Sequence, residues 1–533
     1  MRLSSALAPR WAAGGQRRRM RDESGRRPLS PRDDAGAQPP VLDGSQRPPS
    51  RRQVGALAAL GVALTACSPG GGAPASAGVT NSDLEVVQAA TGLLDRLAGA
   101  VRTGDRALWA STVAPASPGP ATSRPVPAWS AIGSPSASSP APSPAPLAPA
   151  GDPVARLIGD FEVLSALRWV TWRYENVRLD DTPQVQVPGS TPRRWVRADL
   201  VAQIHGVDRE PTVGTHRFAL IRVATGWRLC SQDASPALSQ PWSLPGAQVR
   251  TGDFGAVLVT APTREVVPIP PPSTAPAGGG AADQGSSPVG TSDPAAAALA
   301  EYAEAAAQAR QRLLRLWPGE PDWGLLVVAP ATDSDYLALT HGIPAQLSHV
   351  AGVTDGPLDA SGRAVADRIA LNPQAMARLS GAGRSFVVAH EAAHARLRLL
   401  VPGRTVRWLV EGFADWVGYE ESGLTASVIA QDALAHVRAH GLPDAFPDDA
   451  AFDAALTDLA ATYQFSWLLV ALLIEDHGLA TVREFVTAAT VPPSSSMAPT
   501  DAVTSAFTDV LHVTVPVVMG RWRARLSLLV GAT

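Results

Sequence analysis

Three long segments of the chain lack hydrophobic periodicity, and they separate the stretches that are patterned. Residues 1–53 are rich in Arg, Pro, Gly, Ser and Asp, residues 115–150 are almost wholly Pro, Ala and Ser, and residues 266–293 are rich in Pro, Gly, Ala and Ser. Segments of such composition bury too little apolar surface to offset the entropy of folding. We expect a disordered N-terminal extension, a disordered insertion and a linker.

The stretch from residue 81 to residue 265, which contains the insertion, begins with helical patterns and continues with alternating ones. Residues 81–110 place apolar side chains along one helical stripe, and residues 152–166 also read as a helix. Four runs of strand-like alternation follow, separated by turn residues: 168–177, 194–204, 215–224 and 226–230. Helices followed by antiparallel strands predict a small α+β domain, which faintly resembles the nuclear-transport-factor-like fold.

After residue 293 the pattern becomes mostly helical. An Ala-rich helix is expected at 294–316, a buried strand at 323–329 and a short strand at 368–371. Further helical patterns follow at 383–400, 405–420, 425–440, 451–477, 480–488 and 519–529. A small sheet followed by many helices predicts that residues 294–533 form an α+β enzyme domain.

Length, charge and cysteine content narrow the classes of function. A chain of 533 residues is too long for one ordinary core, so two or more domains are expected. The net charge is −3 and the cationic residues are all Arg, a balance that gives no support for a nucleic-acid partner. Two cysteines, Cys67 and Cys230, exclude a disulfide framework and a Cys-rich zinc module.

An apolar run of thirteen residues, 54–66, follows Arg51 and Arg52 and ends at Cys67. It is too short for a permanent membrane-spanning helix, but a charged flank, a short apolar stretch and small residues are typical of an export signal. The alternative is a short buried apolar segment that happens to end in a cysteine.

The sequence Leu64-Thr65-Ala66-Cys67 resembles the lipobox of bacterial lipoproteins. The resemblance implies that 54–67 is a lipoprotein signal, that Cys67 is lipidated, and that residues 68–80 are a flexible tether. The mature protein is then expected on the extracytoplasmic face of the cell membrane, held by the lipid at Cys67.

The main candidate chemistry lies in the sequence His390-Glu391-Ala392-Ala393-His394. Residues four apart on a helix lie on one face, so the two imidazoles can bind one metal ion, with zinc as the usual ion for this motif. A catalytic zinc site needs a third protein ligand, and Glu411 on the following helix is the candidate. Asp415, one turn later, is expected to accept a hydrogen bond from His390 and orient its ring.

This HExxH motif, followed by Trp-Leu-x-Glu-Gly-Phe-Ala-x-Trp at 408–416, resembles the gluzincin metallopeptidases, which include thermolysin-like and aminopeptidase-like enzymes. The resemblance covers roughly residues 320–530. It implies one zinc ion, a small twisted sheet above the active-site helix, a helical lower lobe and an edge strand that binds the peptide substrate. We place that edge strand at Arg368–Asn372. The aminopeptidase signature Gly-x-Met-Glu-Asn is absent, which favours an endopeptidase.

The roles of two more residues follow from this expectation. Glu391 would act as the general base toward the attacking water and later protonate the leaving amine. Tyr463, which opens a long apolar helix as the transition-state tyrosine does in similar peptidases, is the candidate donor to the oxyanion. A packing role for Tyr463 is the alternative.

Two alternatives to a peptidase stay open at this point. The chain could be a non-catalytic cell-surface binding protein with a degenerate peptidase domain. It could also be a zinc hydrolase whose substrate is not a peptide, because the motif defines the activated water better than the bond it attacks. A second pair of histidines four apart, His436 and His440, reads as surface residues at a helix end.

Overall fold

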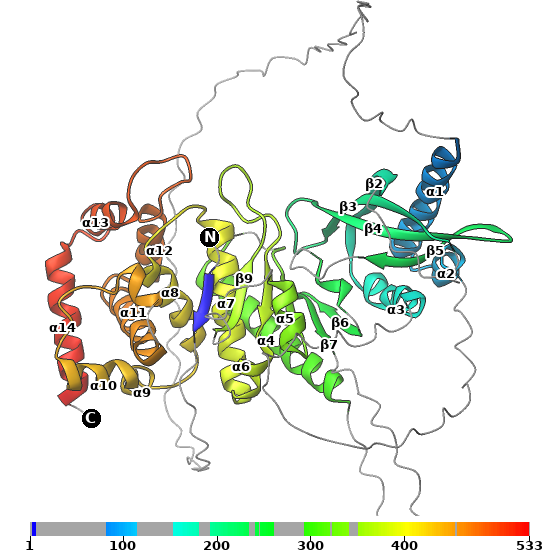
Figure 1. Cartoon of the computed structure of the whole chain (residues 1–533). Helices are drawn as coiled ribbons and strands as arrows, with labels where there is room; N and C mark the ends of the chain where they lie inside the picture. Colours follow the sequence, from blue (N-terminus) through cyan, green and yellow to red (C-terminus); the bar gives the residue numbers. More distant parts are fainter. Residues whose placement is uncertain are drawn as a thin grey trace, which may run out of the picture. The chain divides into compact units, whose positions relative to one another are not determined.

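The computed structural model shows a mixed α+β protein with two sheets, as the pattern predicts (Figure 1). The residues that it describes belong to one compact unit. They are 3–6, 81–114, 153–180, 192–233, 240–244, 246–260, 293–319, 322–340, 350–453 and 456–531. The predicted signal at 54–67 with Cys67, the tether at 68–80 and the insertion at 115–150 lie outside these residues, as does nearly all of the linker at 266–293. Of the N-terminal extension at 1–53, expected to be disordered, only residues 3–6 are described, and they form a strand.

The first sheet is built from four antiparallel strands in the order β2-β3-β4-β5. The strands are β2 (Trp169–Leu179), β3 (Arg194–Ile204), β4 (Thr212–Val223) and β5 (Gly226–Asp233). Three helices pack with them: α1 (Asn81–Thr103), α2 (Arg106–Thr112) and α3 (Pro153–Ala166). The single helix predicted at 81–110 is two helices, because Gly104 adopts a positive φ and Asp105 caps α2.

The second sheet has six strands in the order β1-β9-β10-β8-β7-β6. They are β1 (Leu3–Ala6), β6 (Ala247–Gly252), β7 (Gly255–Thr260), β8 (Leu325–Ala329), β9 (Val350–Asp355) and β10 (Arg368–Leu371). The β6–β7 hairpin joins this sheet because β7 pairs in parallel with β8. The sheet that contains β8 therefore begins before residues 266–293, which the sequence pattern had suggested as a linker between domains.

The position of β10 differs from the expectation for the substrate-facing edge. β10 pairs with β8 on one side and with β9 on the other, so it has no free edge. The expectation that Arg368–Asn372 forms the edge strand is therefore wrong. The strand next to β10 is β9, whose other side pairs antiparallel with β1, so β1 and β6 are the edge strands of this sheet.

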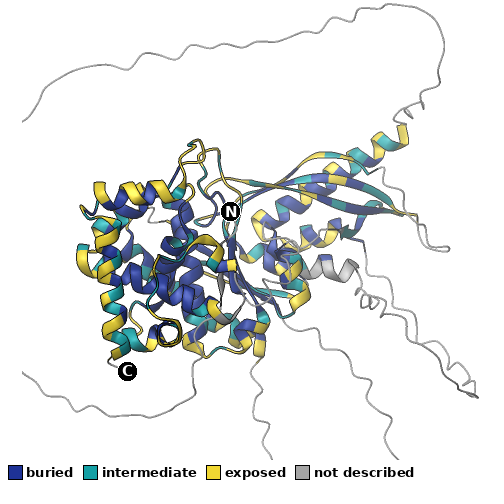
Figure 2. Cartoon of the chain, turned by 60° about the vertical axis from the view of Figure 1, so that its left-hand side comes forward, coloured by how far each residue is buried: buried dark blue, intermediate teal, exposed yellow. Residues whose placement is uncertain are grey.

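Helices cover the second sheet and continue to the C-terminus. These are α4 (Pro294–Leu316), α5 (Asp333–Leu339), α6 (Pro373–Ala377), α7 (Gly381–Leu400), α8 (Arg407–Tyr419), α9 (Ala426–Ile429), α10 (Gln431–His440), a 3-10 helix η3 (Asp449–Asp453), α11 (Leu456–His477), α12 (Leu479–Ala488), α13 (Pro499–Asp509) and α14 (Val515–Gly531). Helix α7 packs against α4, α8 and β9, and α8 packs against α11. Buried residues concentrate along these inner elements (Figure 2).

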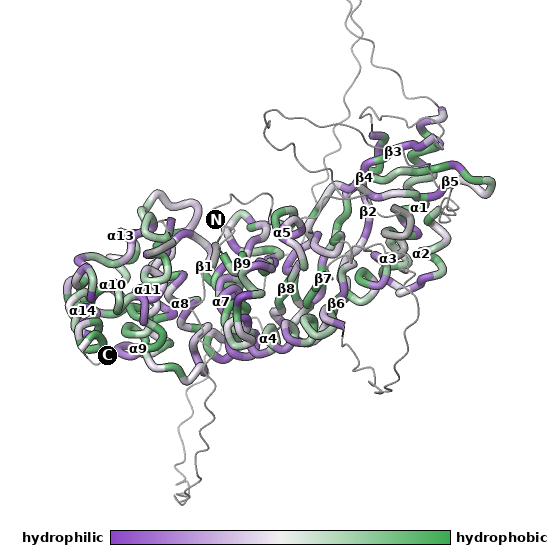
Figure 3. The backbone as a smooth tube through the Cα atoms, turned by 60° about the horizontal axis from the view of Figure 1, so that its bottom comes forward, coloured by the Kyte–Doolittle hydropathy of each residue, from purple (hydrophilic) through white to green (hydrophobic). Residues whose placement is uncertain are grey.

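Helix α11 is the one helix among the described residues that is long and apolar enough to cross a membrane. Its candidate window, Asp458–His477, is 78% buried within the structure, which is the ordinary property of a core helix. Much of it is green in the hydropathy view, as is the buried strand β8 (Figure 3). The helix therefore gives no support to a membrane span.

A buried ion pair links β10 to the turn after β3. Arg368 Nη1 donates to Asp208 Oδ1 at 2.5 Å, and the two side chains are 0% and 1% exposed. Asp208 Oδ2 also accepts from the backbone N–H of Ile204 at 2.8 Å.

We predict that Asp208→Ala lowers the free energy of unfolding by about 3–5 kcal/mol, because it leaves the Arg368 guanidinium buried without its carboxylate. Urea denaturation measures this loss. Glu162→Ala is the control, since it removes an exposed ion pair with Arg106 and should change stability little. An equally small loss for Asp208→Ala would contradict a stabilising role for the buried pair.

Candidate metal centre

Helix α7 carries the two histidines of the motif on its buried face. Ser380 caps the helix, its side chain accepting from the N–H of Gly383. His390 and His394 are both 0% exposed, and their Nε2 atoms face each other at 2.9 Å. The Nδ1 atom of His390 lies 2.8 Å from Asp415 Oδ1. A proton on Nδ1 would donate to this carboxylate and leave the Nε2 lone pair toward His394.

Helix α8 brings the third candidate ligand to these rings. Glu411 is 0% exposed, and its Oε2 lies 3.4 Å from His390 Nε2 and 3.3 Å from His394 Nε2. The three candidate ligand atoms all lie within 4.8 Å of one another. The structure thus brings together His390, His394 and Glu411, and it places Asp415 on the far nitrogen of His390.

Two glycines on α8 allow its close approach to neighbouring helices. A Cβ at Gly412 would lie 2.4 Å from the carbonyl oxygen of Ser466 on α11. A Cβ at Gly418 would lie 2.6 Å from the ring of Phe386 on α7. The sequence therefore needs small residues here to hold Glu411 and Asp415 beside α7.

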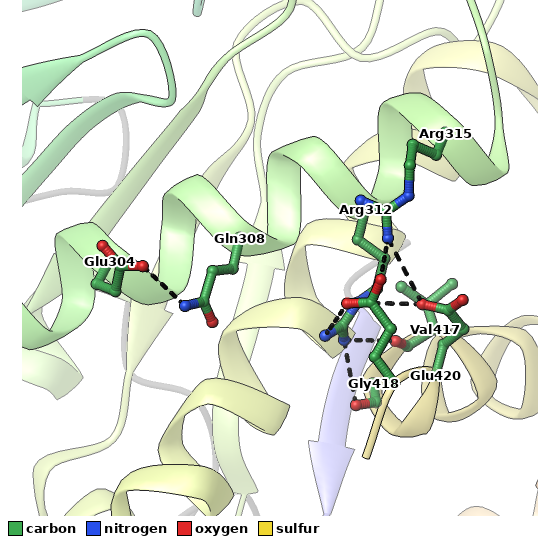
Figure 4. A network of polar contacts seen from close by, with 8 residues as sticks. Glu304, Gln308, Arg312, Arg315, Val417, Gly418 and Glu420 are labelled. Atoms are coloured by element: carbon green, nitrogen blue, oxygen red, sulfur yellow. Dashed lines mark hydrogen bonds and ion pairs between the residues drawn. The ribbon is translucent and has the colours of Figure 1, made fainter. Parts of the chain in front are cut away.

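The C-terminal end of α8 is also fixed by arginines of α4 (Figure 4). Arg312 Nη1 donates to the carbonyl oxygens of Val417 at 2.9 Å and of Gly418 at 3.3 Å. Arg312 Nε lies 3.5 Å from Glu420 Oε2, and Arg315 pairs with Glu421. These contacts satisfy the carbonyls of Val417 and Gly418 in the last turn of α8 and tie this turn to α4.

The electrostatics of the cluster suit a cation. Burial raises the pKa of Glu411, but the imidazoles of His394 and His390 outweigh this and lower it to about 2. Burial lowers the pKa of His390, but the hydrogen bond to Asp415 and the nearby carboxylate of Glu411 outweigh this and raise it to about 10. The negative carboxylate of Glu411 therefore faces the protonated, positively charged ring of His390. A metal ion can replace that proton as the positive charge in the cluster.

The donor set also fits zinc. Two imidazole nitrogens and one carboxylate oxygen are the protein ligands of many catalytic zinc sites. Both carboxylate oxygens of Glu411 are buried and make no hydrogen bond within the described part of the chain. A buried carboxylate without such bonds is costly unless a cation neutralises it. The residues present therefore fit one metal ion held by His390, His394 and Glu411.

The general-base candidate lies against the sheet. Glu391 is 0% exposed, and its Oε2 lies 2.7 Å from Thr354 Oγ1 on β9. The sequence pattern missed β9 and therefore missed Thr354. The signal that could have found them is the β-branched content of Val350, Val353 and Thr354.

Tyr463 lies on α11 beside the histidines and is 5% exposed. Its ring centroid is 6.5 Å from that of His390 and 5.2 Å from that of Phe452 on η3. The guanidinium of Arg407 lies 4.9 Å from the Phe452 ring centroid, and Arg407 Nη1 donates to Asp453 Oδ1 at 2.7 Å. The sequence pattern did not predict that Phe452 lies beside Tyr463 or that Arg407 lies over Phe452, although Arg407 precedes Glu411 by one helical turn.

The second pair of histidines lies at the surface. His436 is partly exposed, with its Nδ1 3.8 Å from Asp458 Oδ1, and His440 is exposed at the end of α10. Neither belongs to the group of described residues that can hold a metal.

Comparisons with family models, curated proteins and solved structures found no match for this chain. The resemblance to gluzincins therefore rests on the motif residues of the sequence.

We predict that zinc binding weakens as the pH falls below the raised pKa of His390. One proton must leave this ring before its Nε2 can bind the ion, so the apparent Kd should rise about tenfold for each pH unit lost. Competition with a chelator at several pH values measures it. A Kd that stays constant from pH 8 to pH 6 would contradict a ligand role for His390.

We also predict that Asp415→Ala weakens zinc binding about 10–100-fold, because the carboxylate orients the His390 ring and increases its basicity. The same chelator competition measures this change. The control is Asp432→Ala, which removes a carboxylate that accepts from Gln464 on α11. Equal affinities for both variants would contradict the assigned contact.

Proposed function

We propose that this chain is a zinc-dependent peptidase, and specifically an endopeptidase. The observation that carries the proposal is the convergence of His390, His394 and Glu411 in one buried cluster, with Asp415 on the far nitrogen of His390. These residues follow the order of the gluzincin motif, although the sixteen residues between His394 and Glu411 are a little fewer than in the best-known gluzincins. A catalytic acid–base residue, Glu391, stands next to the first ligand.

The proposed mechanism uses the residues around the cluster. A zinc ion held by His390, His394 and Glu411 would polarise the scissile carbonyl and make a water molecule acidic. Glu391 takes a proton from the attacking water and gives it to the leaving amine. The Tyr463 hydroxyl donates a hydrogen bond to the developing oxyanion.

The sheet β9-β10-β8, with α7 packed against it and a helical lobe after α7, supports a zincin-like fold for residues 294–533. The four-stranded sheet with α1–α3 supports a nuclear-transport-factor-like fold for the first α+β domain. We place the substrate backbone along β9, the strand next to β10, where Leu3–Ala6 pairs antiparallel in the structure. An extended peptide can use the same backbone groups as a strand does.

We further propose that the protein is anchored by a lipid at Cys67 on the extracytoplasmic face of the cell membrane. The support is the charged flank, the apolar run and the lipobox-like sequence at 54–67. The partners are then a membrane and a peptide or protein substrate outside the cytoplasm, and no nucleic acid.

One observation favours a second candidate function. His390, Glu391, His394 and Glu411 are all 0% exposed, so the cluster is closed to a peptide in this conformation. A non-catalytic cell-surface binding protein with a degenerate peptidase domain would need no access. Such a protein would have no use for a general base, and the presence of Glu391 favours the peptidase.

Metal analysis combined with a mixed peptide library tests the proposal. We expect one zinc ion per chain and cleavage at internal bonds of the library peptides by the full chain. Bound zinc without any cleavage would favour the binding protein. Cleavage of ester or amide model compounds without peptide cleavage would indicate a zinc hydrolase with a non-peptide substrate.

A further inference from the structure

Strand β9 directs two residues at the side chain of Glu391. Gly352 and Thr354 are two apart on a strand, so they lie on the same face of the sheet. The register of β9 on β10, with Thr354 opposite Ile369 and Gly352 opposite Leu371, fixes both residues over α7. The face that they form is buried, and Thr354 is 0% exposed.

The Thr354 hydroxyl contacts both the side chain and the backbone carbonyl of Glu391. The Thr354 hydroxyl oxygen lies 2.7 Å from Glu391 Oε2 and 3.0 Å from the Glu391 carbonyl oxygen. A hydroxyl can donate to a carboxylate, and it can accept from a carboxylic acid while it donates to the carbonyl. The contact can therefore persist whether or not Glu391 carries a proton.

Gly352 provides the space that the Glu391 side chain occupies. A Cβ at position 352 would lie 2.8 Å from Glu391 Cγ, 2.9 Å from Oε1 and 3.0 Å from Cδ. Gly352 is not among the described glycines with positive φ, so backbone conformation does not require a glycine here. The reason for glycine at this position is the close approach of the Glu391 carboxylate.

We propose that Gly352 and Thr354 form a seat that positions Glu391, with Thr354 holding Oε2 and Gly352 leaving room for the rest of the carboxyl group. The catalytic consequence rests on the proposed function, since a seat is useful only if Glu391 must point at the reacting water. Thr354 is a positioning residue in this reaction, because it acts through Glu391. The competing explanation is that Thr354 only ties β9 to α7 through the Glu391 carbonyl.

Kinetics of Thr354 variants separate these two explanations. We expect Thr354→Val, which keeps the shape but loses the hydroxyl, to lower kcat about 10–100-fold with KM and zinc content unchanged. Thr354→Ser should recover most of the lost kcat. The matched control is Thr112→Val, which removes a fully buried hydroxyl that donates to the Trp109 carbonyl and should leave kcat unchanged. Equal kcat values for the Val and Ser variants of Thr354 would overturn the positioning role.

A double-mutant cycle, measured by urea denaturation, tests whether Gly352 makes room for Glu391 without any activity measurement. Gly352→Ala should lower the urea midpoint clearly in the unmodified chain but much less in a Glu391→Ala background, where the three clashing atoms are gone. Equal losses in both backgrounds would overturn the seat, even if peptides are cleaved. Absence of hydrolysis by the unmodified chain would instead overturn the proposed function and, with it, the catalytic role of the seat. The double-mutant cycle would still show whether Gly352 accommodates the Glu391 side chain.

Discussion

Glu391→Gln will keep one zinc ion per chain and lose peptide hydrolysis by about 10³-fold or more. The substitution preserves the size of the side chain and can still contact the Thr354 hydroxyl. It leaves His390, His394 and Glu411 unchanged, so metal binding should not suffer. An amide cannot take up the proton that the attacking water must lose, and the loss of a general acid–base residue costs about 10²–10⁴ in rate.

The measurement is kcat/KM on a peptide selected from the library, with zinc content determined on the same samples. Glu301→Gln is the matched control, because Glu301 is a glutamate on α4 that pairs with Arg384 at 2.7 Å outside the metal cluster. It should retain full activity. Full activity in Glu391→Gln would refute the proposed mechanism, and loss of zinc in this variant would show that Glu391 is a ligand.

Local patterns were sufficient to predict the elements that hold the candidate metal ligands. The spacing of His390 and His394 predicts a shared helical face, and that relation depends only on helix geometry. The spacing of Glu411 and Asp415 predicts a second helix facing the first, which the structure has as α8. The strand predicted at 368–371 coincides with β10, because its four residues are all buried and its ends are marked by charged and turn residues.

Features that depend on distant pairings could not be predicted from the sequence. Strand β9 contains Gly352, which weakens its strand signal, and its position is fixed by pairing with β10. Without β9, the contact of Thr354 with Glu391 could not be expected and β10 was mistaken for the edge strand. The β6–β7 hairpin joins β8 across residues 261–324, and no local pattern encodes that choice.

Glu411→Ala will abolish tight zinc binding, with a loss of affinity larger than the 10–100-fold expected for Asp415→Ala. The substitution removes the one carboxylate among the three candidate ligands, whose Oε2 lies 3.4 Å from His390 Nε2 and 3.3 Å from His394 Nε2.

A bound ligand at a thousandfold excess over its Kd stabilises a folded protein by about 4 kcal/mol, so zinc should raise the Tm of the unmodified chain and leave that of Glu411→Ala almost unchanged. Glu301→Ala, the control, should keep the full zinc-dependent rise, because Glu301 lies outside the cluster on α4. The metal-free Glu411→Ala protein should still fold, because the imidazoles left behind can lose their proton and become neutral, with His390 still bonded to Asp415. A normal zinc-dependent rise in Glu411→Ala would mean that another residue completes the site, and the gluzincin-like ligand set would then be wrong.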